Sequence, residues 1–260
     1  MSIWGKIIGG AAGFALGGPL GALLGALAGH AVDRHVEGET PAIAGPDGQQ
    51  GGGAGAGTDD RAATRQIAFT IAVIALGAKM AKADGQVSRS EVAAFKEVFQ
   101  VPANETANVA RVFDLAKRDA RGFEPYAKQV ARMFRKGHPV LEELLDGLFH
   151  IARADGRVHE SELAYLAEVA RLFGFTEADF ARIREANVGP DKADPYTILG
   201  VRREMSNEEI RAAWRKLVRD NHPDKLIAQG LPEELVTLAN QKLATINAAY
   251  DKVAKERGIS

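Results

Sequence analysis

Residues 206–225 read SNEEIRAAWRKLVRDNHPDK, and this stretch specifies a helix together with its start and its end. Ser206 and Glu209 have the spacing of a capping box, in which each side chain bonds a backbone N–H of the first turn. The apolar residues that follow share one helix face: Ile210, Ala213 and Leu217. Pro223 disfavours helical geometry at His222, so the helix must end before the His-Pro-Asp tripeptide. The stretch therefore predicts an amphipathic helix followed by a rigid turn.

The flanking segments predict two more helices. In DPYTILGV (194–201), Asp194 can cap a short helix that has Pro195 in its first turn and ends at Gly200. Downstream, Pro232 suits the start of a third helix. The apolar positions of that helix follow helical spacing: Leu235, Leu238, Ala239, Leu243, Ile246 and Tyr250. Two antiparallel helices are thus expected to bracket the tripeptide.

This carboxy-terminal module, residues 189–260, resembles the J-domain of DnaJ-type co-chaperones. The Pro-Tyr-x-x-Leu-Gly entry, the basic helix, the tripeptide and the apolar third helix occur in the family's order. The resemblance implies that His222, Pro223 and Asp224 contact a DnaK-type chaperone ATPase and stimulate its ATP hydrolysis. No nucleophile or third catalytic group accompanies the His/Asp pair, so we predict no enzymatic activity, and we expect no cofactor.

The cations of the second helix have two interpretations. With four cations against three acids, residues 207–221 carry a net charge of 4 − 3 = +1, which alone describes an ordinary solvated face. The resemblance implies instead that these cations steer the module onto an acidic surface of the ATPase. They are Arg211, Arg215, Lys216 and Arg219. Trp214, on the same helix, is expected to be partly exposed.

Residues 61–188 show helical apolar spacing without an alternating strand pattern, which predicts an all-α domain. Helical stretches are expected near 104–118, 124–136, 140–153 and 160–173. Pro139 suits a first helical turn, and Thr176 to Asp179 has the pattern of a capped start.

An internal repeat organises this domain. KMAKADGQVSRSEV (79–92) and HIARADGRVHESEL (150–163) align without a gap at an offset of 150 − 79 = 71. Each copy contains a helix end, an Asp-Gly turn and an acidic residue that opens the next helix. The repeat predicts two related helical hairpins.

The repeat is not an EF-hand, because its earlier ligand positions would fall on Met80 and Lys82 in the first copy and on Ile151 and Arg153 in the second. It resembles the tellurite-resistance TerB-like family, in which acidic residues of the two repeats are linked to divalent-metal binding. The matching positions are Asp84, Glu91, Asp155 and Glu162. We favour structural turns and caps at these positions over a metal site. The alternative function is a metal-responsive stress adaptor that uses its J-domain as a docking handle.

Residues 1–35 are predicted to form a membrane-anchor helix of the glycine-zipper type. Glycine recurs at every fourth position from Gly5 to Gly29, and no Asp, Glu, Lys or Arg occurs from Ile7 to Val32. Those 32 − 7 + 1 = 26 residues would span about 39 Å as a helix, enough for a hydrocarbon core of about 30 Å. A stripe of small residues lets membrane helices approach closely, so a homodimer is expected.

Three alternatives exist for this segment. They are a signal peptide cleaved after Ala28, a helix buried in a soluble core, and a flexible leader. Residues 36–60 are rich in glycine and are expected to form a flexible linker.

The 260 residues carry a formal charge of −1, which argues against nucleic acid as a partner, and they contain no cysteine, which excludes disulfides and thiol chemistry. The order of anchor, linker, TerB-like domain and J-domain resembles the DjlA family of membrane-anchored DnaJ-like proteins. This implies a co-chaperone at the bacterial inner membrane, with its soluble domains facing the cytoplasm, that acts in protein folding or stress response. The charges that flank the apolar segment favour a cytoplasmic amino terminus as well, whereas a single spanning helix would place the two ends of the chain on opposite sides. A re-entrant hairpin at Gly17-Gly18-Pro19 would allow both ends to be cytoplasmic.

Overall fold

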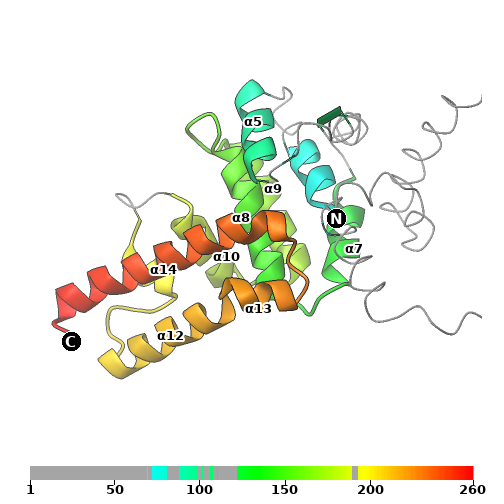
Figure 1. The fold of residues 1–260 in the computed structure, drawn as a ribbon. Helices are drawn as coiled ribbons and strands as arrows, with labels where there is room; N and C mark the ends of the chain where they lie inside the picture. The colour runs from blue at the N-terminus through cyan, green and yellow to red at the C-terminus, as the bar shows by residue number, and fades with distance from the viewer. Residues whose placement is uncertain are drawn as a thin grey trace, which may run out of the picture.

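The computed structural model is helical throughout the part of the chain that it describes. The described residues are 69, 72–80, 88–98, 101, 106, 107, 110, 122–188 and 193–259. No strand occurs among them, which confirms the predicted all-α class (Figure 1). The expected membrane helix (1–35) and linker (36–60) lie outside these residues. Within the described ranges, no helix is long and apolar enough to cross a bilayer.

The TerB-like domain is built around one central helix. Besides the helical residues 72–80, its elements are α5 (Arg89–Val98), α7 (Glu124–Ala131), α8 (Pro139–Ala152), α9 (Glu160–Phe173) and α10 (Glu177–Ala186). Helix α8 packs against both α5 and α9. Helix α9 begins 160 − 89 = 71 residues after α5, which is the offset of the sequence repeat.

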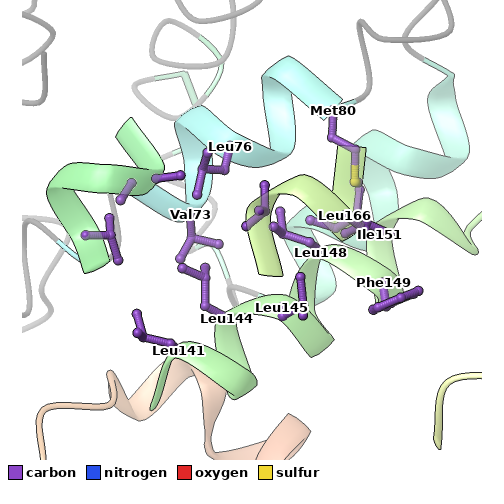
Figure 2. Close-up of a cluster of buried hydrophobic side chains, with 14 of the residues drawn as sticks. Val73, Leu76, Met80, Leu141, Leu144, Leu145, Leu148, Phe149, Ile151 and Leu166 are labelled. Atoms are coloured by element: carbon purple, nitrogen blue, oxygen red, sulfur yellow. The ribbon is translucent and has the colours of Figure 1, made fainter. Parts of the chain in front are cut away.

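The core of this domain surrounds α8. Every residue from Val140 to Phe149 is buried, as expected for a helix covered on all sides. Figure 2 shows Leu144 of α8 beside Val73 from the helical residues 72–80. The two repeats are also joined by a buried hydrogen bond of 2.9 Å, which the hydroxyl of Tyr165 donates to the carbonyl of Leu76.

Two predicted helix starts are confirmed, and one predicted helix is shorter than expected. Helix α8 has Pro139 in its first turn, and Thr176 caps α10 by accepting a hydrogen bond from the Asp179 N–H. Helix α7 ends at Ala131, whereas the pattern predicted helix to residue 136. Phe134 packs against the core, and the left-handed Gly137 (φ 65°) redirects the chain toward α8. The prediction was too long because the apolar spacing continues to Phe134, beyond the end of the helix at Ala131.

The J-domain has the predicted hairpin. Its elements are α11 (Pro195–Leu199), α12 (Asn207–Asp220), α13 (Pro223–Ala228), the 3₁₀ turn η2 (Glu233–Leu235) and α14 (Val236–Arg257). The predicted caps are present: Asp194 accepts from the Thr197 N–H, and Ser206 and Glu209 form the capping box. Helices α11, α12 and α14 enclose a second, smaller core.

Helix α14 belongs to both cores. Its carboxy-terminal half packs Ile246, Ala249 and Val253 into the J-domain core. Ahead of that half, four residues are buried in the TerB-like core: Leu226, Leu231, Leu235 and Ala239. Burying one leucine contributes about 1.5–3 kcal/mol. Helical spacing did not show which core covers Leu235 and Ala239, and in the structure they pack the J-domain against its neighbour.

Candidate functional site

The His-Pro-Asp tripeptide forms the start of a helix. Helix α12 ends at Asp220, where the buried Asn221 caps it by donating from its N–H to the carbonyl of Leu217. His222 is extended (φ −66°, ψ 128°), and its Nδ1 accepts a hydrogen bond of 3.3 Å from the Asp224 N–H. The sequence predicted a turn here. It did not show that the proline and the aspartate open α13.

At this helix start, the buried residues face the protein core and the residues beside them face solvent. Pro223 is buried, and Leu226, one turn further along α13, is fully buried in the TerB-like core. The side chains of His222 and Asp224 are 51% and 89% exposed, with His222 Nδ1 lying 3.8 Å from Asp224 Oδ2. The tripeptide therefore offers an imidazole and a carboxylate to an incoming surface from a backbone that is fixed from behind.

Three cations beside the tripeptide surround one carboxylate. Asp220 lies 2.7 Å from Lys225 Nζ, 3.1 Å from Lys216 Nζ and 3.7 Å from Arg219 Nε. Burial acts to raise the pKa of Asp220, but the hydrogen bonds from Lys225 and Lys216 outweigh it and hold that pKa below its usual value. The side chains of Lys216 and Arg219 remain about 70% exposed. Lys225 joins the predicted cations, because α13 folds it back toward the end of α12.

The other residues of α12 divide by their place on the helix. Arg215 is exposed, whereas Arg211 is partly buried and lies eight residues before Arg219, about 12 Å along the axis. Trp214 is partly buried, as predicted. Its ring stacks on Tyr250 at 4.2 Å, and its Nε1 donates to Asn247 of α14. Trp214 thus holds α12 against α14.

Two of the candidate metal ligands act as helix caps. Glu91 accepts a hydrogen bond of 2.6 Å from the Ser88 N–H, and the Ser88 hydroxyl accepts one from the Glu91 N–H. Glu162 accepts a bond of 2.8 Å from the His159 N–H in the second copy. Burial is the main cause that raises the pKa of Glu162 to about 6.

Among the described residues, Asp155 belongs to no ligand set. Asp155 is exposed, accepts from the Arg157 N–H and lies 3.0 Å from His159 Nε2. Asp84 lies outside the described residues. In the part of the chain that the structure describes, no group of three or more His, Asp or Glu side chains is placed to hold a metal ion.

A buried ionic cluster fixes the J-domain to α8. Lys242 of α14 places its Nζ 2.6 Å from Glu142, 3.0 Å from Asp146 and 3.1 Å from Glu143. Arg182 of α10 forms a two-pronged pair with Glu142 at 2.6 and 2.9 Å. All of these side chains are buried or nearly so. The cluster joins three helices from both sides of the domain boundary.

The three carboxyl groups of this cluster differ in how well nearby cations compensate for their burial, and their pKa values shift in different directions. Burial alone would raise the pKa of Glu142, but Lys242 and Arg182 hold it at about 2. Burial raises the pKa of Glu143 to about 7, because Lys242 only partly compensates for the lost hydration. The pKa of Asp146 is also raised by burial. Burial acts to lower the pKa of Lys242, but the three carboxylates outweigh it and raise that pKa.

An exposed His-Pro-Asp tripeptide between a basic helix and an apolar one, mounted on a TerB-like helical domain, defines a J-domain protein. Family models match in the same order: "Co-chaperone DjlA transmembrane domain" over residues 1–57, "Tellurite resistance protein TerB" over 70–185, and "DnaJ domain" over 194–257. The chain belongs to the DjlA co-chaperone family.

Relatives support this membership along the whole chain. The co-chaperone protein DjlA of Photobacterium profundum is 32% identical, over 98% of this chain and 99% of the relative. The protein of the same name from Vibrio cholerae is 33% identical over the full length of both chains. No solved structure matches the chain.

Proposed function

We propose that this chain is a membrane-anchored co-chaperone whose J-domain binds a DnaK-type chaperone and stimulates its ATP hydrolysis. The observation that carries the proposal is the fixed helix start of α13, which exposes His222 and Asp224 while Pro223 and Leu226 are buried. The names of the relatives and the match to the DnaJ domain support the same role.

The chain acts through contact and contributes no catalytic group. The carboxylate of Asp224 and the imidazole of His222 bind the partner more favourably in its hydrolysing arrangement, and this difference in affinity shifts the partner's conformational equilibrium. Lys216, Arg219 and Lys225 attract an acidic surface and orient the encounter, which affects mainly the association rate. The bond-breaking chemistry stays in the partner's own nucleotide site, so the chain itself is not an enzyme.

The amino-terminal segment brings this activity to the bacterial inner membrane. The match of residues 1–57 to a transmembrane-domain model supports anchoring there. Because the partner is a cytoplasmic ATPase, the TerB-like domain and the J-domain face the cytoplasm. The glycine stripe from Gly5 to Gly29 pairs two copies of the anchor, so the working unit is a homodimer.

A pull-down from bacterial membrane extracts tests the proposal. The full chain in detergent should capture a DnaK-type chaperone in the presence of ATP, and His222→Gln should lose that capture. Lys255→Gln, on an exposed position near the end of α14, is the matched control and should capture as the original chain does. Since His222 caps α13, the helical content of the variant is checked by circular dichroism; a lost cap costs about 1 kcal/mol. Equal capture by His222→Gln would contradict the proposal.

A further inference from the structure

The connection between α7 and α8 is strongly basic. Residues 125–141 contain no aspartate or glutamate in a chain whose overall formal charge is −1. The cations of this stretch are Lys128, Arg132, Arg135 and Lys136. All four are exposed, and among the described residues Arg132, Arg135 and Lys136 form no ion pair or side-chain hydrogen bond. Among the described residues, Arg132, Arg135 and Lys136 therefore present unpaired positive charge on this surface.

The backbone of the α7–α8 loop (residues 132–138) is held in place. Phe134 points into the core, with its ring 6.0 Å from Phe69. The Gly137 N–H donates a hydrogen bond of 3.0 Å to the carbonyl of Phe173 at the end of α9. A Cβ on Gly174 would lie only 2.6 Å from the Cβ of Lys136, so the two segments are in close contact. The cations therefore project from a defined surface.

This loop lies beside the J-domain segment that follows the tripeptide. Figure 1 shows the connection from α7 to α8 passing α13. A Cβ on Gly230, just after α13, would lie 3.9 Å from the ring of Phe134. Burial lowers the pKa of His138, and the charges of Arg135 and Lys225 lower it further, which places both cations near this imidazole. Lys225 in turn reaches Asp220 on α12.

We propose that the α7–α8 loop extends the chaperone-docking surface of the J-domain onto the TerB-like domain. Arg132, Arg135 and Lys136 meet an acidic surface of the same DnaK-type ATPase that receives the tripeptide. The inference rests on the proposed function, because it adds a second contact to that complex.

Two considerations favour the chaperone over an anionic lipid surface as the occupant. The loop continues the row of cations that runs from Lys216 through Arg219 and Lys225, beside the tripeptide that the partner must cover. A specific protein interface also buries about 800 Å² and some 20–30 residues on each side. The exposed residues of α12 and the tripeptide are too few for that, and the rigid loop is the adjoining surface with unpaired charge of the same sign.

The test compares two double charge reversals in the full chain, reconstituted in nanodiscs of neutral lipid. Arg135→Glu/Lys136→Glu alters the loop. Lys96→Glu/Arg157→Glu is the matched control, since it changes the net charge equally at two exposed positions, one on α5 and one after the end of α8. We expect the loop variant to slow association with the ATP-bound chaperone by about 5–10-fold and to weaken the salt dependence of the rate, while the control stays near the wild-type rate. Arg135→Glu alone leaves the contact of Lys136 with Gly174 intact and should slow association by about 2–3-fold.

Three results would overturn the inference. The loop variant could associate as fast as the control, or the control could slow association equally. The effect could also occur only in nanodiscs that contain anionic lipid, which would assign the loop to the membrane surface. A wild-type chain that does not bind or stimulate the chaperone would instead remove the proposed function itself, so the two failures are distinguishable.

Discussion

Lys242→Met tests whether the J-domain is held on the TerB-like domain by the buried ionic cluster. The variant keeps much of the side-chain volume but removes the cation that lies within 3.1 Å of Glu142, Asp146 and Glu143. Removing one partner of a buried ion pair costs about 3–5 kcal/mol, because the remaining charges lose their compensation. Proton uptake by Glu143 offsets part of this cost, so we expect a loss of about 3 kcal/mol. For a unit of 150–250 residues this corresponds to a decrease in Tm of roughly 6–12 °C.

The assay is thermal unfolding of the full chain in detergent at neutral pH, followed by circular dichroism and by tryptophan fluorescence in a Trp4→Phe background, so that the signal comes from Trp214. Lys255→Met, on the exposed end of α14, is the control and should change the Tm by no more than about 2 °C. Because Leu226, Leu231 and Leu235 lie in the TerB-like core, both signals should shift together. If Lys242→Met melts like the control, or if Trp214 reports a separate transition that the variant leaves unchanged, the shared core does not couple the two domains.

Three further predictions concern other parts of the chain. Burial raises the pKa of Glu143 from 4.5 to about 7, so as pH rises the unfolded chain loses this proton before the folded chain does. The free energy of unfolding should therefore fall by up to about 3 kcal/mol between about pH 4.5 and pH 7. Glu143→Gln should flatten that decrease in urea titrations, and an unchanged pH profile would refute the assignment. Gly174→Ala should destabilise by about 1–3 kcal/mol more than Gly258→Ala, because both glycines have positive φ but only Gly174 is in close contact with Lys136; equal Tm values would contradict this. For the anchor, leucine replaces three glycines of the stripe: Gly13, Gly17 and Gly21. This change should weaken self-association in sedimentation experiments while keeping the chain in the membrane fraction, and unaltered assembly would remove the homodimer prediction.

Local signals predicted the helix starts because they act over three or four residues. The Ser206/Glu209 capping box and the Asp194 cap satisfy backbone groups of the adjoining turn, and Pro139 fits a first turn; the structure contains all three features. The 71-residue repeat likewise gave α5 and α9 the same register. A capping motif can be recognised from a few neighbouring residues, because the groups that it joins are close in sequence.

Contacts between distant segments could not be predicted in this way. Helical spacing placed Leu235 and Ala239 on an apolar face but did not show which domain covers it. No sequence pattern singled out Lys242, whose partner Glu142 lies 242 − 142 = 100 residues earlier in the chain. The end of α7 was missed because Phe134 prolongs the apolar pattern while the backbone turns.

The candidate site shows the same division. The order of motifs identified the tripeptide, and its exposed imidazole and carboxylate agree with a docking role. Pro223 and Asp224 begin a helix whose Leu226 is buried in the neighbouring domain, and that burial could not be read from the motif. The proximity of Lys225 to α12, and that of the α7–α8 loop to α13, likewise follow from the tertiary packing.

The most direct test of the co-chaperone assignment is single-turnover ATP hydrolysis by a DnaK-type chaperone, measured with and without the full chain. The wild-type chain should accelerate hydrolysis. Asp224→Asn should abolish the acceleration while leaving helical content and Tm unchanged, because this side chain is 89% exposed and its backbone N–H still bonds His222. If the wild-type chain does not accelerate hydrolysis, or if Asp224→Asn accelerates it equally, the co-chaperone assignment is contradicted.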